Sequence, residues 1–157
     1  MMRTRMANPA MFVPGAMEAL QTLGSLLQAG SAPAGTAALV HLRASQINGC
    51  SVCVEFGAKA ALGGGDSPER LVALSAWRES PRFSEAEKAA LALTEAVTRL
   101  SDQSDPVPDT VWAEAARHYD EAALAHILLA IAVTNLYNRL NVPTRQQAAE
   151  QAPEWSA

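Results

Sequence analysis

The chain has 157 residues, of which 49% are hydrophobic and 18% are charged, and its formal net charge is -4. This composition is typical of a globular protein, and the length suits a single domain with a buried core, so an intrinsically disordered chain is excluded. The acidic balance offers no electrostatic surface for nucleic acid, and we expect no nucleic-acid partner.

The first residues carry no continuous apolar core and no clear cleavage site, so we do not interpret them as a signal peptide. We expect residues 1–13 to form a flexible arm, with Met11 and Phe12 as a small anchor against a neighbour. No apolar run reaches the roughly 20 residues of a membrane helix. The closest, 122–133, is interrupted by His126. We therefore expect no membrane partner.

Apolar residues recur at helical spacing along the chain, which predicts an all-α fold of about seven helices in one domain over residues 1–157. Ser67 with Pro68 marks one helix start, Ser84 with Glu87 forms a capping box, and Asp109 and Asp120 can cap two later helices. We expect a C-terminal tail at 146–157. The expected helices lie at about 15–28, 36–46, 50–62, from 68, 84–100, 109–118 and 120–140.

The segment 120–140 is apolar nearly all round, which is typical of a helix buried on all sides. In a chain of this size such a helix indicates a subunit interface as well as a core, so we expect a homo-oligomer. Asn135, Tyr137 and Asn138 are polar groups near its end and need partners. His126 is interpreted as a packing histidine rather than a ligand.

Cys50 and Cys53 are the two cysteines of the chain, and they follow a turn signal at Asn48–Gly49, where Asn48 could cap the next helix. Residues three apart share a helix face, so the two sulfurs can form a disulfide. A helix start favours the thiolate and can lower a cysteine pKa from about 8.5 to roughly 3.5–7.5. A redox pair is the leading interpretation, and two inert buried thiols are the alternative.

The rest of the chain does not supply the roughly four ligands that structural zinc needs. There is no second cysteine pair, and the three histidines do not have zinc-finger spacing. We expect no metal and no cofactor. A single C-x-x-C without other cysteines fits a reducing compartment, which predicts a cytoplasmic protein.

The run LRASQINGCSVC at 42–53, with the segments 71–98 and 119–142 in the same order and spacing, resembles the alkylhydroperoxidase AhpD-like core of the carboxymuconolactone decarboxylase family. The resemblance covers about residues 15–145. It implies an all-helical subunit assembled as a trimer or hexamer. The thiol members of the family reduce peroxides, which implies that Cys53 attacks and Cys50 resolves.

The thiol members of this family carry a proton relay that this chain lacks. Their glutamate stands twelve residues before the first cysteine, where this chain has Ala38, and their histidine stands four residues after the second, where it has Gly57. Some members also have a histidine where this chain has Val52. A glycine at position 57 indicates either the close approach of a neighbour or a pocket in place of the imidazole.

Two other residues are candidates for the missing relay. His41 lies on the same helix face as Ala38 and could point toward the thiols; the alternative is a partly exposed histidine beside Arg43. Glu95 lies in an apolar run and could be a buried carboxylate with a raised pKa near the site. Its alternative role is an ion pair with Arg43 or Arg139.

The function predicted from these features is reduction of a peroxide through Cys53 and Cys50, with an external dithiol protein recycling the disulfide. One alternative is a redox-sensing or otherwise non-enzymatic oligomer that has lost the relay. Another is an enzyme of the carboxymuconolactone decarboxylase type acting on a lactone acid.

Overall fold

A computed structural model describes residues 3–33 and 35–148. In this part of the chain the structure is all-helical, with seven α-helices, three short 3-10 helices and no strand, as predicted. The elements in chain order are η1 (Pro9–Met11), α1 (Ala16–Gln28), α2 (Thr36–Asn48), α3 (Ser51–Gly63), α4 (Pro68–Ala73), η2 (Leu74–Ala76), α5 (Glu85–Thr98), η3 (Leu100–Asp102), α6 (Asp109–His118) and α7 (Glu121–Thr144).

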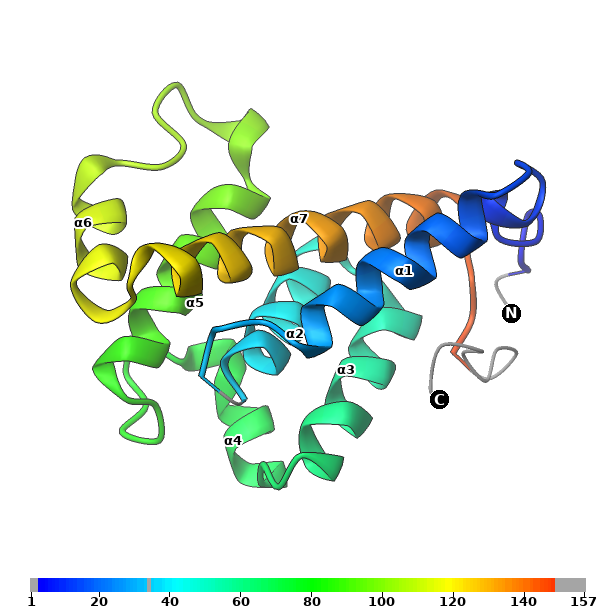
Figure 1. Cartoon of the computed structure of the whole chain (residues 1–157). Helices are drawn as coiled ribbons and strands as arrows, with labels where there is room; N and C mark the ends of the chain where they lie inside the picture. The colour runs from blue at the N-terminus through cyan, green and yellow to red at the C-terminus, as the bar shows by residue number, and fades with distance from the viewer. Residues whose placement is uncertain (1–2, 34, 149–157) are drawn as a thin grey trace.

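The long helix α7 runs the length of the molecule, and α1 lies alongside it (Figure 1). Helix α2 packs against α3, α5 and α7, which makes it the central element of the fold. Helix α6 covers α5 at one end of α7. The first described residues lie at the other end of α7, next to its C-terminus (Figure 1).

The core consists of two clusters of buried apolar side chains, and α2 contributes to both. Val40 belongs to the cluster that contains Ile127 and Ile131 of α7. Leu39 and Leu42 belong to a second cluster, which also contains Leu74, Trp77, Phe83 and Leu91. Burial of α2 on two sides fixes its position between the clusters, and this helix carries His41, which is half-buried.

Several predicted helix boundaries are confirmed, and others are wrong. Ser67 and Asp120 cap α4 and α7, and the capping box of Ser84 with Glu87 is present. Asp109 is not a cap: it is the first residue of α6, and Pro108 precedes it at the cap position. Helix α7 does not end near residue 140.

Helix α7 continues through Pro143 to Thr144. The hydroxyl of Thr144 donates to the carbonyl oxygens of Leu140 and Asn141, at 2.6 and 3.2 Å, which stabilises the last turn around the proline. Arg145, in a left-handed conformation with φ of 56°, then ends the helix. The extra turn contains Asn141, whose side chain contacts Cys53.

By length and composition alone, α7 is also long and apolar enough to cross a membrane. The helix meets this criterion by its mean hydropathy, although His126 and the polar residues from Asn135 onward interrupt its apolar run, as the sequence indicated. Half of its most apolar window is buried inside the domain, and the core helix of a soluble protein satisfies the same criterion. The property is therefore weak support for a membrane span.

The arm expected at 1–13 is held against the end of α7 over part of its described length. The backbone N–H of Arg5 donates to the carbonyl oxygen of Thr144 at 2.9 Å, and its guanidinium donates to that of Pro143 at 3.0 Å. The side-chain amide of Gln146 donates to the carbonyl oxygen of Met6 at 2.8 Å. Of the tail expected at 146–157, the part beyond residue 148 lies outside the described residues.

Candidate active site around the Cys50–Cys53 disulfide

The two cysteines form a disulfide at the N-terminus of α3, with their Cα atoms 5.3 Å apart. Cys50 is the N-cap of the helix, and its sulfur accepts the backbone N–H of Cys53 at 3.4 Å. The expectation that Asn48 caps this helix is wrong, because α2 extends to Asn48. Gly49, at φ 68°, provides the left-handed residue that ends α2 and reverses the chain.

Asn48 instead anchors the turn before the cysteines to α7. Its side-chain nitrogen donates to the side-chain oxygens of Asn135 and Asn138, both at 2.9 Å. The side-chain nitrogen of Asn138 in turn donates to the Ser45 hydroxyl at 3.3 Å. The polar groups near the end of α7 thus have the partners that the sequence required, and they fix the position of the cysteine turn.

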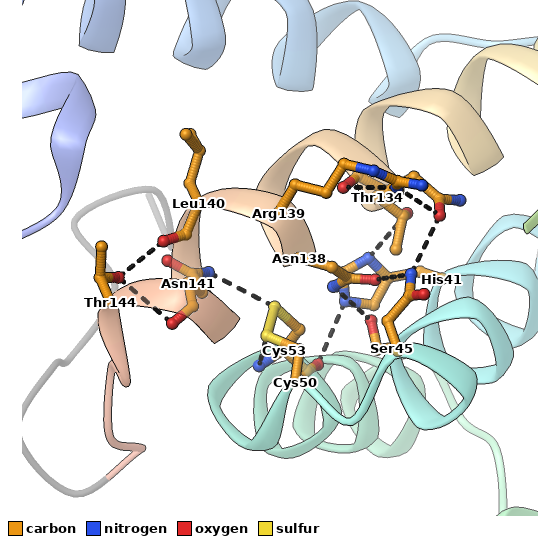
Figure 2. The surroundings of a disulfide bond; sticks show 12 residues. His41, Ser45, Cys50, Cys53, Thr134, Asn138, Arg139, Leu140, Asn141 and Thr144 are labelled. Atoms are coloured by element: carbon orange, nitrogen blue, oxygen red, sulfur yellow. Dashed lines mark hydrogen bonds between the residues drawn. A yellow bond between two sulfur atoms is a disulfide. The ribbon is translucent and has the colours of Figure 1, made fainter.

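His41 points from α2 into the space between α3 and α7 (Figure 2). Its Nε2 lies 3.2 Å from the carbonyl oxygen of Cys53, and its Nδ1 lies 3.2 Å from the Thr134 hydroxyl. Burial lowers the pKa of His41 below its usual 6.5, and the hydrogen bond to Cys53 opposes this in part. The ring is therefore neutral at pH 7 and can accept a proton.

The position of His41 explains the glycine at position 57. A Cβ atom built on Gly57 would lie 2.6 Å from Cδ2 of His41 and 3.2 Å from its Nε2. Of the two explanations offered by the sequence, the close approach of a neighbour is therefore the one observed. An imidazole is present beside the cysteine helix, but it comes from α2 rather than from α3.

Both cysteines are buried: Cys50 is 1% exposed and Cys53 is 5% exposed. They pack with Val52, and Ala148, which follows α7, lies against them. The side-chain nitrogen of Asn141 donates to the sulfur of Cys53 at 3.4 Å (Figure 2). The segment that follows α7 therefore covers part of the disulfide, and both sulfurs have little contact with solvent.

Glu95 takes the structural alternative that the sequence left open. Its carboxylate accepts hydrogen bonds from Arg43 at 2.6 and 2.8 Å, from Trp77 at 2.9 Å, from Arg78 at 2.7 Å and from Arg99 at 3.5 Å. Burial alone would raise its pKa, but the hydrogen bonds from Arg78, Trp77 and Arg43 outweigh burial and lower it to about 2. The expectation of a raised pKa is wrong, and the contacts favour a role in the fold.

His126 and Glu55 also have structural partners. His126 accepts the backbone N–H of Ala32 at 3.0 Å through Nδ1, and its Nε2 lies 2.9 Å from the carbonyl oxygen of Leu27. These contacts are those of a packing histidine. Glu55 is exposed and forms an ion pair with Lys59. Among residues 3–33 and 35–148, no group of three or more His, Cys, Asp or Glu side chains could hold a metal ion.

Two further residues, Thr134 and Asn141, contact the site and were not predicted from the sequence. A signal for Asn141 was present, because it follows Asn138 by three residues and so lies on the same face of the helix. The helix was expected to end at about residue 140, one residue before Asn141. No comparable signal marks Thr134 within the apolar run.

The model of the family described as "Carboxymuconolactone decarboxylase family" matches residues 14–96. The uncharacterised protein YdfG of Bacillus subtilis (strain 168) is 31% identical over 138 residues, which is 88% of this chain and 92% of YdfG. The uncharacterised protein YnjA of Escherichia coli (strain K12) is 33% identical over 103 residues, which is 66% of this chain and 55% of YnjA.

Two solved structures are similar to this one. The first is a protein of unknown function from Agrobacterium tumefaciens, proposed to be the antioxidant defence protein AhpD. It has a TM-score of 0.85 and 33% identity over 92% of this chain and 97% of its own. The debrominase Bmp8 shares the fold, with a TM-score of 0.77 and 24% identity over 85% of this chain and 71% of its own. The chain belongs to the carboxymuconolactone decarboxylase family, with an AhpD-like fold.

Proposed function

We propose that this protein reduces peroxides through its two cysteines, with Cys53 as the attacking thiol and Cys50 as the resolving thiol. The observation that carries the proposal is the pairing of Cys50 with Cys53 at the start of α3, with the neutral ring of His41 beside Cys53. A helix N-terminus favours a thiolate, and a nearby base can take the proton from the thiol.

The proposed cycle has three balanced steps. The Cys53 thiolate attacks the outer oxygen of a hydroperoxide, which breaks the O–O bond, forms a sulfenic acid and releases an alcohol after protonation. The thiol of Cys50 then attacks the sulfenic acid, forming the disulfide and releasing water. An external dithiol protein reduces the disulfide and is itself oxidised to a disulfide, so one peroxide consumes one dithiol.

The partners of His41 suit both the neutral and the protonated ring, and its contact with Cys53 is to the backbone carbonyl oxygen rather than to the sulfur. In the neutral ring, Nε2–H donates to the Cys53 carbonyl and the Thr134 hydroxyl donates to Nδ1. When Nδ1 is protonated, it donates to the Thr134 oxygen, and the hydroxyl turns to the carbonyl oxygen of Ala130, which lies 2.8 Å away. Rotation of one hydroxyl therefore accommodates the added proton.

The burial of both sulfurs favours a second candidate, a redox sensor that forms its disulfide slowly and does not turn over. In such a protein the covered disulfide would change the packing of the segment after α7 without a catalytic cycle. The two candidates differ in rate rather than in chemistry, so kinetics with a recycling dithiol distinguish them.

The test is stopped-flow reaction of the reduced protein with hydrogen peroxide and an organic hydroperoxide, followed by steady-state turnover with a generic dithiol. We expect rapid oxidation in the wild-type protein, loss of oxidation in Cys53→Ser, and a trappable sulfenic acid in Cys50→Ser. Equal peroxide turnover after Cys53→Ser would reject the proposal. Oxidation without turnover would support the sensor.

The substrate panel should include two further compounds. A small lactone acid tests the decarboxylase alternative of the family. A brominated pyrrole is included because the debrominase Bmp8 shares the fold and was crystallised, as a single-residue variant, with 2,3,4-tribromopyrrole. Turnover of either compound, without turnover of peroxides, would replace the proposed function by another reaction.

We also propose that the protein is a homo-oligomer that associates through α7. One face of this helix is exposed and apolar. It is formed by Ala125, Leu129, Ala132 and Leu136, at spacings of three and four residues. Leu129 and Leu136 are 41% and 37% exposed. A continuous apolar stripe on a long helix is typical of a surface covered by a partner. The dithiol cycle requires a reducing compartment, and we propose the cytoplasm.

A further inference from the structure

The N-terminal arm contacts the sulfur of Cys53 through one intermediate residue, Asn141. The side-chain nitrogen of Asn8 donates to the side-chain oxygen of Asn141 at 3.1 Å, and the side-chain nitrogen of Asn141 donates to the sulfur of Cys53 at 3.4 Å. All three residues are buried, with exposed fractions of 5%, 2% and 5%. A hydrogen-bonded line thus joins residue 8 to the proposed attacking sulfur.

A backbone hydrogen bond fixes which end of the Asn8 amide faces Asn141. Asn8 is the N-cap of η1, and its side-chain oxygen accepts the backbone N–H of Ala10 at 3.0 Å. The side-chain nitrogen of Asn8 is therefore the group that faces Asn141. Because a nitrogen donor requires an acceptor, Asn141 presents its oxygen to Asn8, and its NH₂ group is left to face Cys53 (Figure 2).

The orientation of the Asn141 amide matters because a thiolate only accepts hydrogen bonds. An NH₂ group directed at the sulfur stabilises its charged form, whereas an amide oxygen directed at it would oppose that charge. No other side-chain or backbone hydrogen-bond partner of the Asn141 side-chain nitrogen is present in the described part of the chain. In a buried site little water is present to weaken the difference between the two orientations.

We propose that Asn8 is a positioning residue of the active site, which holds the Asn141 amide in the orientation that stabilises the Cys53 thiolate. The inference rests on the proposed function in taking Cys53 as the reactive thiol. It adds that the arm is part of the site, so that a change at position 8, far from the cysteines in sequence, alters their reactivity.

The test compares two substitutions that both retain the N-cap of η1. Asn8→Asp keeps the shape and the capping oxygen but replaces the donor by an acceptor, so the Asn141 amide is expected to turn its oxygen toward Cys53. Asn8→Ser keeps a capping oxygen and replaces the amide donor by a shorter hydroxyl without adding charge. Met11→Asp is the matched control, because Met11 lies in the same arm, is 67% exposed and receives the same charge.

The measurement is the thiolate absorbance of Cys53 against pH, in a reduced Cys50→Ser background in which Cys53 is the single thiol. We expect Asn8→Asp to raise the Cys53 pKa by about one unit, a tenfold loss of thiolate at a given pH below it, and Asn8→Ser to raise it by less. Alkylation by iodoacetamide at a fixed pH should slow in proportion. Met11→Asp should leave both unchanged.

An unchanged Cys53 pKa in both Asn8 variants, or an equal rise in Met11→Asp, would overturn the inference. The titration needs no peroxide, so it is independent of the proposed activity. A shifted pKa in a protein that does not turn over peroxide would leave the inference standing and reject the proposed function. Peroxide turnover with no shift of the Cys53 pKa would support the proposed function and reject the inference about Asn8. If Asn8→Asp does not fold, Asn8→Ser carries the test.

Discussion

The imidazole of His41 occupies the space into which a side chain at Gly57 would project. The closest approach to a Cβ at position 57 would be 2.6 Å, from Cδ2 of the ring. The two positions therefore exclude one another, and an imidazole can be presented to Cys53 from α2 or from α3 but not from both. This chain has the residue pair that places it on α2.

This exclusion predicts the behaviour of substitutions at the two positions. His41→Ala should lower the rate of Cys53 oxidation by about 10²-fold, which is the lower end of the contribution of a positioned acid–base group. Gly57→Ala should also lower this rate, because the added methyl group displaces the ring from the Cys53 carbonyl. The double variant His41→Ala/Gly57→His should recover much of the rate, since it moves the imidazole to α3. Stopped-flow oxidation measures all three.

The control for these variants is Gly63→Ala, because a Cβ at Gly63 meets nothing within 4 Å and Gly63 lies on the same helix. It should have the wild-type rate. Wild-type oxidation in His41→Ala would show that the ring has no part in the chemistry and serves only to pack α2 against α3.

The low pKa of Glu95 predicts a stability contribution that depends on pH. The folded pKa is about 2, against a usual value of 4.5, so the folded state binds fewer protons than the unfolded state between these values. The contribution is fully present above about pH 4.5 and is lost as the pH falls toward 2. Glu95→Gln should therefore lower the free energy of unfolding by about 2–4 kcal/mol at pH 7, since Arg43 loses its charged partner.

Urea denaturation of the wild-type protein and of Glu95→Gln at several pH values measures this contribution. The difference between the two proteins should shrink on acidification. Glu55→Gln is the matched control, because the side chain of Glu55 is 46% exposed and its ion pair with Lys59 should contribute little. A difference for Glu95→Gln that is constant from pH 7 to pH 3 would contradict the assignment of its charge.

The cover over the disulfide predicts how fast the disulfide is reduced. Arg5 binds the arm to the end of α7 through hydrogen bonds to Thr144 and Pro143. Ala148, a few residues further along the chain, packs against the cysteines. Arg5→Ala removes the guanidinium bond to Pro143, so the cover should open more often and reduction by dithiothreitol should accelerate by about two- to tenfold. Arg3→Ala is the control in the same arm. A slower or unchanged reduction of Arg5→Ala would show that opening occurs elsewhere.

The sequence predicted the all-α fold and the cysteine turn because both depend on local patterns. These patterns are helical periodicity, the capping box at Ser84 and the glycine after Asn48. Each extends over a few residues and can be recognised in the sequence. The resemblance to the family added Cys53 as the attacking thiol. His41 was identified by its helical spacing from Ala38, a local relation that the structure reproduces as a contact with Cys53.

The site residues that the sequence did not resolve depend on contacts between distant segments. The shortest contacts of Glu95 come from Arg43 on α2 and from Trp77 and Arg78 after η2, which are distant in sequence. Arg99, four residues after Glu95, is the one local partner, and its contact is the longest at 3.5 Å. Asn8 and Asn141 meet across 133 positions of sequence. Asn141 lies in the turn that contains Pro143, beyond the helix end expected at about residue 140.

The apolar stripe of α7 predicts the effect of a charge at its centre. Leu136→Glu places a carboxylate at a position that is 37% exposed in the single chain and would be covered in an oligomer. Desolvation of that charge should dissociate the assembly, while the fold of the subunit is retained because the side chain faces outward.

Val72→Glu on α4 is the matched control, since Val72 is 78% exposed and lies away from α7. Light scattering after gel filtration should give the wild-type mass for Val72→Glu and a smaller mass for Leu136→Glu. A wild-type protein of monomer mass, or an unchanged assembly in Leu136→Glu, would show that α7 does not form the interface.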